Sequence, residues 1–284
     1  MPKAFEGYID VAKENQIIFK VPRDIDRKDA NPGMDLYDYV VAAYDHHICI
    51  LKRAGNEIIK KEANYQDIQG ISNYQNLLLG ELTLFLDDET LKIKYNTVSS
   101  DIIFKFVKII RNKYITTDSL LPHNPLKDHT VRNLEIFYFN ELNRLKQYDN
   151  NLKVISLQPT TKLSYKDSGF FKKVFHKLVR STLPSSLYLS NQKEMIIITK
   201  GRKIRIFNRP DYSYTYTYIP YNQIQSAVLQ PEESITEVEK FIISTKQYTF
   251  DYLFISNNDY KHSLSKNLRQ ALIPPCVTAN LSKQ

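Results

Sequence analysis

The feature of this sequence that most constrains its fold is an internal repeat with a separation of 156 residues. The matching residues are Arg53 with Arg209 (209 minus 53), Tyr65 with Tyr221, Ile68 with Ile224, and Gln69 with Gln225. The apolar segments 40–42 and 196–198 fall in the same register without a gap, as do Ile48 and Ile50 with Ile204 and Ile206. A repeat of this kind predicts that one structural unit occurs twice.

The second copy begins with a predicted hairpin. Residues 195–198 are an apolar run that stops at Lys200-Gly201, after which Ile204 and Ile206 alternate with basic residues. This period of two is typical of half-buried strands, and it also predicts a third strand over residues 212–219. The upstream counterpart is a hairpin of residues 39–43 and 47–51 that turns at residues 44–46.

Each copy is expected to end with further strands and one amphipathic helix. In the first copy, strands over 57–61, 77–86 and 91–95 precede a helix over 99–114, and a hairpin of 5–11 and 16–21 opens the chain. In the second copy, strands over 241–245 and 248–255 precede a helix over 259–272. The helices are predicted from apolar residues at helical spacing opposite a basic face.

This order of elements resembles the pleckstrin-homology (PH) superfold. Residues 219–228 are similar to a step of GRAM and bacterial PH-like domains, in which a hydrophobic-Pro-hydrophobic triplet precedes spaced Ile and Val residues. Residues 199–204, with Arg202, resemble the Thr-x-x-Arg hairpin that comes before that step. The resemblance covers about 90 residues in the second copy and about 80 in the first, where Ala63-Asn64 replaces Ile219-Pro220.

The resemblance implies an α+β fold with two PH-like antiparallel β-rolls, each capped by a C-terminal helix and joined by a helical connector. The expected boundaries are 1–116 for the first PH-like domain, 117–182 for the connector and 183–284 for the second domain. Within the connector, helical spacing predicts helices over 128–147 and 168–181, with a strand over 154–157 between them.

Composition limits the class of partner. A formal charge of +8 and a pI near 9.1 favour anionic partners. The N-terminal segment lacks the pattern of a signal peptide, and no apolar window has the length of a membrane-spanning helix, so we expect a cytoplasmic chain. Two cysteines without framework spacing, Cys49 and Cys276, favour a reducing compartment.

Two motifs resemble metal sites, and we expect neither to bind metal. Asp45-His46-His47 resembles the signature of the DHH phosphoesterases, but the aspartate-rich element of that family is missing, and the repeat places the triplet on a hairpin turn aligned with residues 201–203. The aspartates of residues 24–38 do not have EF-hand spacing, because Lys28 and Asp29 stand where an oxygen ligand and glycine are required. No cofactor is predicted.

A basic hairpin and the second connector helix are the candidate contacts for a ligand or an anionic membrane. The residues are Lys193, Lys200, Arg202, Lys203, Arg205, Phe171, Lys172, Lys173, Phe175 and Lys177. The hairpin cations resemble the spacing by which PH domains hold phosphoinositides, and the helix has the Phe-rich and basic faces of an interfacial helix. The alternative is that the helix packs on a sheet with its lysines solvated. Binding is expected in the second half alone, because Asp45, His46 and His47 occupy the first copy's turn.

A ladder of tyrosines is the candidate interaction surface. Its members are Tyr212, Tyr214, Tyr216 and Tyr218, which share one face of a predicted strand. Such rings can pack on the connecting helices, on a second subunit or on the bases of single-stranded nucleic acid. Basic residues are sparse within the ladder, so nucleic acid is not the expected partner.

The sequence shows no catalytic constellation. Ser/His/Asp and Cys/His groupings cannot be assembled from its few histidines, and none of its glycines form a phosphate-binding loop. We therefore predict a non-catalytic binding or scaffolding protein with a protein partner or self-association. The alternatives are peripheral binding to an anionic membrane surface, and an enzyme or nucleic-acid binder.

Overall fold

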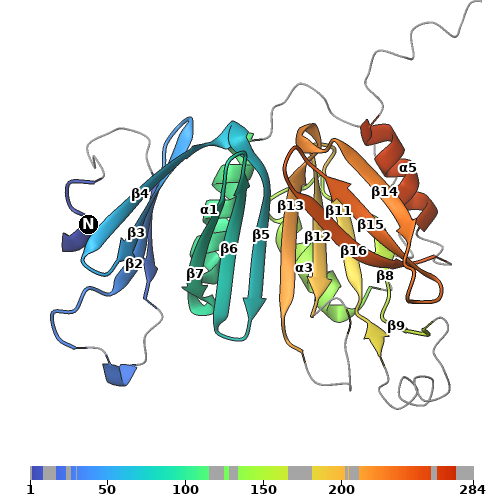
Figure 1. The fold of residues 1–284 in the computed structure, drawn as a ribbon, viewed down its shortest axis with the longest axis horizontal. Coiled ribbons are helices and arrows are strands. Elements are labelled where there is room, and N and C mark those ends of the chain that lie inside the picture. The colour runs from blue at the N-terminus through green and yellow to red at the C-terminus, as the bar shows by residue number, and fades with distance from the viewer. Residues whose placement is uncertain are drawn as a thin grey trace, which may run out of the picture. The chain divides into compact units, whose positions relative to one another are not determined.

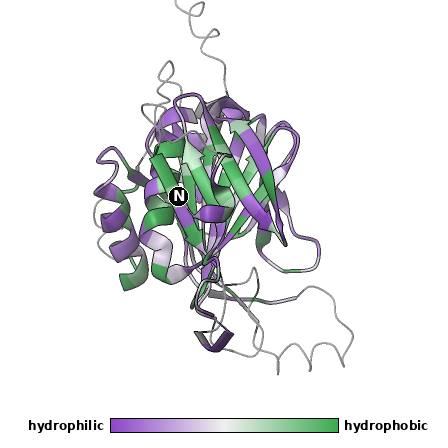
Figure 2. Ribbon diagram, turned by 90° about the vertical axis from the view of Figure 1, so that its left-hand side faces the viewer, coloured by the Kyte–Doolittle hydropathy of each residue, from purple (hydrophilic) through white to green (hydrophobic). Residues whose placement is uncertain are grey.

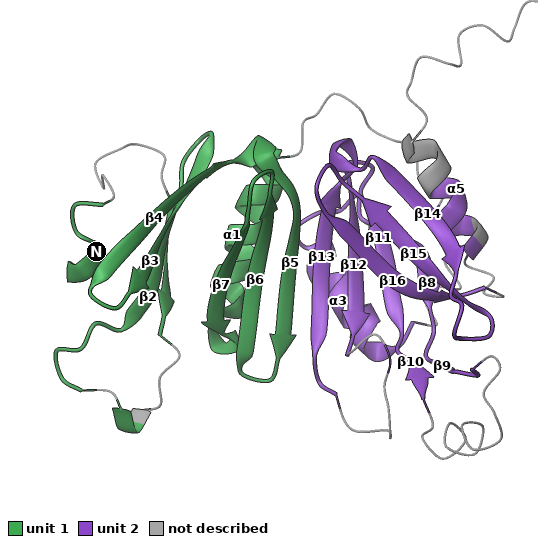
Figure 3. Cartoon of the chain, in the orientation of Figure 1, with its two compact units in different colours: residues 1–116 green, residues 117–284 purple. Residues whose placement is uncertain are grey.

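The chain is mainly antiparallel β structure with few helices, which confirms the predicted α+β class. The structure, a computed structural model, describes residues 2–8, 17–23, 27–29, 31–114, 125–127, 134–165, 181–201, 204, 211–256 and 261–272. The chain divides into two compact units, residues 1–116 and residues 117–284 (Figure 3). Each unit is described separately below.

Unit 1 contains two groups of antiparallel strands followed by a helix (Figure 1). Its elements are η1 (Lys3–Phe5), β1 (Ile17–Pro22), η2 (Arg27–Asp29), β2 (Tyr37–Ala43), β3 (His47–Ala54), β4 (Glu57–Asn64), η3 (Tyr65–Asp67), β5 (Ile68–Asn76), β6 (Leu79–Leu86), β7 (Thr90–Asn96), η4 (Thr97–Ser99) and α1 (Ser100–Tyr114). Strands β1 to β4 pair in sequence order, and so do β5 to β7.

Both faces of the β1–β4 sheet are covered by apolar side chains, which is why its strands contain long apolar runs. On one face, Phe5 of η1 packs against Val40 and Leu51. On the other face, Phe19 of β1 packs against Phe106 of α1, with ring centroids 5.2 Å apart. Figure 2 shows that the strands contain both hydrophobic (green) and hydrophilic (purple) residues.

Unit 2 has the same order of strands and terminal helix, with an additional helix at its start. Its elements are α3 (Ile136–Lys146), β8 (Lys153–Gln158), β9 (Thr161–Lys162), β10 (Thr182–Leu183), β11 (Ser186–Ser190), β12 (Glu194–Lys200), β13 (Tyr214–Pro220), η5 (Tyr221–Gln223), β14 (Ser226–Pro231), β15 (Val238–Ser244), β16 (Thr249–Ile255) and α5 (Lys261–Leu272). Strands β8, β11, β12 and β13 pair in that order, and β14 to β16 pair in sequence order.

An aromatic cluster joins the two strand groups of unit 2. Tyr188 of β11 is fully buried, and its ring lies 5.8 to 6.3 Å from the rings of Phe241, Tyr252 and Phe254 on β15 and β16. The phenol has no access to water, so its burial raises the pKa of Tyr188 well above the ordinary value. These large side chains form the core of unit 2.

The sequence repeat is explained by a shared turn that follows β4 in unit 1 and β13 in unit 2. Tyr65 and Tyr221 each begin a three-residue 3-10 helix. In unit 1 the N–H of Tyr65 donates to His46 O (3.2 Å) and its hydroxyl donates to Tyr44 O (2.8 Å). In unit 2 the N–H of Tyr221 donates to Lys193 O (2.9 Å) and its hydroxyl donates to Ser190 Oγ (2.8 Å). Each tyrosine therefore holds a turn of its own unit, the β2–β3 turn in unit 1 and the β11–β12 turn in unit 2.

The predicted partner of the 195–198 strand is wrong. Strand β12 pairs with β11 on one side and with β13 on the other, where Lys200 lies opposite Tyr214. Ile204 lies in a bend, while Ile206 and Arg209 lie outside the described residues. By order of pairing, β12 therefore corresponds to β3 and not to β2. The 156-residue register matches β4 with β13 and η3 with η5, and later elements are shifted further apart.

Other predicted elements are confirmed or corrected by the described residues. The helices over 99–114 and 259–272 match α1 and α5, and the helix over 128–147 matches α3 from Ile136. The strand predicted over residues 5–11 is wrong at Phe5, which lies in a 3-10 helix and packs its ring into the unit 1 core. Strand β8, inside the expected connector, pairs with β11 and so belongs to the β structure of unit 2.

The helix predicted over 168–181 lies almost entirely outside the described residues, as does Cys276. Cys49 is buried on β3, and burial raises the pKa of its thiol. Within the part of the chain that the structure describes, no helix combines the length and apolar character needed to cross a bilayer.

A candidate binding cavity in unit 2

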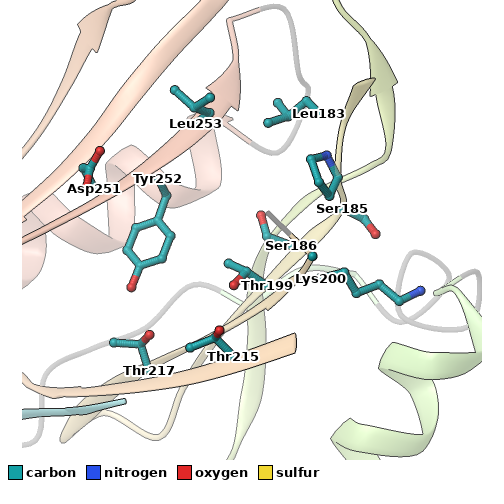
Figure 4. A pocket seen from close by; sticks show the side chains of 12 residues that line it. Leu183, Ser185, Ser186, Thr199, Lys200, Thr215, Thr217, Asp251, Tyr252 and Leu253 are labelled. Carbon is teal, nitrogen blue, oxygen red and sulfur yellow. The ribbon is translucent and has the colours of Figure 1, made fainter. Parts of the chain in front are cut away.

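A cavity of about 220 Å³ lies between the two strand groups of unit 2 (Figure 4). The described residues that line it are Leu183, Pro184, Ser185, Ser186, Thr199, Lys200, Gly201, Thr215, Thr217, Asp251, Tyr252 and Leu253. They come from the segment before β11, from the ends of β12 and β13 that lie beside each other, and from β16. Hydroxyl groups predominate among the polar atoms of this set.

The hydroxyl lining follows from the alternation Tyr-Thr-Tyr-Thr-Tyr of residues 214–218. Successive side chains of a strand point to opposite faces. Tyr214 and Tyr216 point towards α3, where the Tyr214 ring lies 5.3 Å from that of Phe137. Thr215 and Thr217 consequently point into the space between the strand groups, where Figure 4 shows them with Thr199.

Opposite these threonines, Tyr252 extends its hydroxyl towards Thr217 and hydrogen-bonds with it (Figure 4). Burial raises the pKa of Tyr252 far above its ordinary value, so this phenol stays protonated at neutral pH. Ser186, which also lines the cavity, donates its hydroxyl hydrogen bond to the Tyr188 hydroxyl (3.3 Å). The hydroxyl groups of the lining are therefore neutral, and Asp251 adds one carboxylate to the described lining.

The lysine at the rim directs its charge away from the cavity. Lys200 Nζ forms an ion pair with Glu135 Oε2 (2.9 Å) and lies 4.8 Å from the ring centroid of Phe137 and 5.5 Å from that of Tyr138. Its side chain leaves the cavity towards α3 in Figure 4. The ammonium group is thus engaged by a carboxylate and two aromatic faces.

The arrangement suits a small uncharged ligand. A cavity of about 150 Å³ lined by apolar side chains holds one benzene molecule, so the present cavity has room for about one substituted ring. Anions such as phosphate find no unpaired cation among the described lining residues. Ligand hydroxyl or carbonyl groups can bond to Thr199, Thr215 and Thr217, while Leu183 and Leu253 contact apolar parts.

The structure separates the predicted basic residues that it describes. Lys193 lies in the turn before β12 and Lys200 lies at the far end of that seven-residue strand, so they are about 20 Å apart. A single headgroup cannot contact both. Arg202, Lys203 and Arg205 lie outside the described residues, as do Phe171, Lys172, Lys173, Phe175 and Lys177.

The predicted tyrosine ladder is largely internal. Tyr216 and Tyr218 are fully buried, while Tyr212 is 65% exposed and precedes β13. The Tyr216 hydroxyl donates to Glu141 Oε2 (2.5 Å) and accepts from Arg144 (2.7 Å), both on α3. Packing on a connecting helix, one of the alternatives considered from the sequence, is therefore what Tyr214 and Tyr216 do.

The two motifs that resemble metal sites have other roles in the described residues. Asp45 and His46 are exposed in the turn between β2 and β3, and Asp45 pairs with Lys113 of α1 (3.0 Å). Asp35 and Asp38 of the acidic loop pair with Arg53 (3.2 Å) and Arg23 (3.1 Å). Among the described residues, no three His, Cys, Asp or Glu side chains are grouped as metal ligands.

The sequence did not identify Thr215 and Thr217 as site residues, because the tyrosines with which they alternate are the more distinctive residues of this strand. A strand with aromatic residues on one face and threonines on the other can contact a different neighbour on each face. The signal was the presence of Thr215 and Thr217 where an inner face normally has aliphatic residues. The contribution of Tyr252 depends on long-range folding and has no local signal.

No protein-family model matches the chain, and no curated protein sequence matches it.

Proposed function

We propose that this protein is a non-catalytic binding protein made of two PH-like modules, and that the unit 2 cavity holds a small uncharged ligand. The observation that supports it best is the hydroxyl-lined cavity, which has about one ring's volume and whose rim lysine is already paired. The PH-like part rests on the order of elements in each unit: four paired strands, three paired strands and a terminal helix.

The lining residues favour binding over catalysis. The described set contains neither histidine nor cysteine, Tyr252 stays protonated, and Lys200 is paired with Glu135. Acyl or phosphoryl transfer needs a nucleophile with an adjacent base, and Asp251 is the only carboxylate among the described lining residues. Binding of a neutral molecule needs no such pair.

The test is a ligand-observed NMR screen with neutral phenols, amides and alcohols of one ring. Affinities of about 1 mM are expected for molecules of this size, which this method detects. The cavity is filled by Thr215→Phe, since Phe is well tolerated in strands. The matched control is Ile59→Phe, at the position of unit 1 that the 156-residue register aligns with Thr215.

We expect fragments to bind the native protein and Ile59→Phe equally and to lose at least tenfold in affinity for Thr215→Phe. Circular dichroism checks that both variants fold. The proposal is wrong if no neutral fragment saturates, if Thr215→Phe binds as the native protein does, or if anionic fragments bind preferentially.

A further inference from the structure

Two hydroxyl groups meet across the unit 2 cavity, one from each strand group. Thr217 of β13 is 5% exposed, and its hydroxyl hydrogen-bonds with the phenol of Tyr252 on β16. Figure 4 shows these two side chains pointing towards each other from opposite walls. Thr199 and Thr215 lie opposite each other on β12 and β13, are only half-buried, and stand nearer Lys200 at the rim. We call Thr217 and Tyr252 the hydroxyl pair.

The hydroxyl pair has one proton more than its own hydrogen bond uses. Each hydroxyl carries one proton, so the bond between Thr217 and Tyr252 uses one of the two, whichever group donates. Within the part of the chain that the structure describes, neither hydroxyl makes another hydrogen bond. Asp251 precedes Tyr252 in β16, so its side chain points to the opposite face of the strand. One donor of the pair therefore remains available to an acceptor in the cavity.

This donor limits which ligands can fill the cavity. A buried donor without a partner costs more free energy than an unused lone pair on an oxygen. Water can accept the hydrogen bond in the free protein, but a ligand that displaces this water has to replace the bond. The ligand therefore needs an acceptor group at the position of the hydroxyl pair.

A carbonyl group suits this donor better than a carboxylate or a hydroxyl does. A carboxylate would bring a negative charge to a lining in which Lys200, the one cation among the described residues, is already paired with Glu135. A ligand hydroxyl can accept, but it also adds a proton that needs an acceptor of its own. A carbonyl oxygen has two lone pairs and no proton.

We propose that the ligand of the unit 2 cavity is a small neutral ring compound bearing a carbonyl group, and that the hydroxyl pair donates to the carbonyl oxygen. This inference rests on the binding function proposed above and names the ligand class of the same cavity. Leu183 and Pro184 of the lining provide apolar contacts for the ring. A ring without an acceptor would leave the proton of the pair unpaired.

The test compares three compounds with one carbon skeleton, namely acetophenone, 1-phenylethanol and ethylbenzene. They carry a ketone, an alcohol and no polar group, respectively. Their dissociation constants are measured by ligand-observed NMR titration. We expect the native protein to bind acetophenone about tenfold more tightly than ethylbenzene, with 1-phenylethanol between them, because only ethylbenzene leaves the donor unpaired.

The variant Thr217→Val/Tyr252→Phe removes both hydroxyls and keeps the outline of both side chains. Each single substitution is insufficient, because it leaves one hydroxyl with a free proton. The control, Tyr212→Phe/Thr249→Val, removes a phenol and a threonine hydroxyl at exposed positions of unit 2 outside the lining. We expect the first variant to bind acetophenone about tenfold more weakly and ethylbenzene unchanged, and the control to bind both as the native protein does.

Unchanged binding of ethylbenzene shows that the cavity of the variant is folded, and the preference of the native protein decides the ligand class even if the variant does not fold. The inference is overturned if the native protein binds ethylbenzene as tightly as acetophenone, or binds 1-phenylethanol more tightly than either. It is also overturned if Thr217→Val/Tyr252→Phe keeps the ketone preference and Thr199→Val/Thr215→Val loses it.

Failure of this inference can be distinguished from failure of the proposed function. If other neutral fragments bind the cavity while these three compounds do not, or bind without preference for the ketone, only the carbonyl assignment is wrong. If no neutral fragment of any kind binds, both proposals are wrong.

Discussion

Unit 1 and unit 2 close the same turn with the same tyrosine, but they fill the space between their strands differently. Tyr65 and Tyr221 both donate a hydroxyl hydrogen bond of 2.8 Å to the end of the preceding hairpin. The flanking backbone angles are also nearly equal, with φ of −72° at Asn64 and −65° at Pro220. The repeated tyrosine thus fixes the same backbone turn in both units.

The interiors differ at positions that the same register aligns. Lys61 of β4 stands where β13 has Thr217, and its ammonium group pairs with Glu89 between β6 and β7. In unit 1 the buried polar groups also bond to one another, since the Tyr95 hydroxyl donates to Asn73 Oδ1 (2.6 Å) and accepts from Gln75 Nε2 (2.9 Å). In unit 2 the corresponding threonine faces a cavity. The same order of strands can therefore enclose paired polar side chains, as in unit 1, or a cavity, as in unit 2.

The largest expected effect tests the shared frame. Tyr65→Ala and Tyr221→Ala each remove a buried ring and a hydrogen bond, so each is expected to lower the free energy of unfolding of its own unit by about 3–5 kcal/mol. Hydrogen exchange followed by mass spectrometry assigns the loss to a unit. Controls are Tyr74→Ala and Tyr212→Ala, whose exposed rings predict changes within about 0.5 kcal/mol.

If the free energy of unfolding fell by much less in one unit than in the other, the comparison would fail, because the tyrosine would then stabilise only one of the two turns.

A second, smaller effect tests how unit 1 fills its interior. A Cβ at Gly80 would lie 2.3 Å from the Tyr95 ring, so Gly80→Ala forces the ring away and breaks its bonds to Asn73 and Gln75. Overpacking of this kind costs about 1–3 kcal/mol. Chemical denaturation measures it. The control is Gly55→Asn, because Gly55 has a φ of 65° that Asn tolerates and an added Cβ there would meet no atom within 4 Å.

If Gly80→Ala does not change the free energy of unfolding, the hydrogen bonds of Tyr95 do not depend on its close approach to Gly80. Unit 1 would then have unfilled space, as unit 2 does.

The sequence predicted periodic elements well and strand partners less well. Strand β12 and helix α1 were found because their apolar residues follow one clear period. The neighbour of β12 was predicted wrongly because a gapless repeat assigned Ile204 and Ile206 to the next strand, whereas pairing is decided by long-range contacts between β12 and β13. Strands β5 and β11 were missed because polar residues interrupt them.

The candidate sites were predicted less completely than the fold. Alternation predicted the tyrosine face of β13, but not that α3 covers Tyr216 or that the threonine face borders a cavity, since both depend on elements distant in sequence. The sequence grouped Lys193 and Lys200 as contacts for one ligand, but they lie at opposite ends of β12. The strand predicted over residues 77–86 begins only at Leu79, since Leu77 and Leu78 lie in the turn between β5 and β6.

The smallest expected effect concerns the ion pair that stands in unit 1 at the aligned position of Thr217. The Lys61 and Glu89 side chains are each 41% exposed, so the pair is screened by water and salt and is expected to contribute about 0.2–1 kcal/mol. Lys61→Met keeps the aliphatic stem and removes the charge, and Glu89→Gln keeps the shape of its partner. A double-mutant cycle by urea denaturation gives the coupling free energy, which should shrink at high salt. If the coupling free energy is instead large and independent of salt, the ion pair is shielded from water and links β4 to the β6–β7 turn. Unit 1 would then exclude water at this position, where unit 2 has a cavity, because a salt-independent ion pair requires that water be excluded from the space around Lys61.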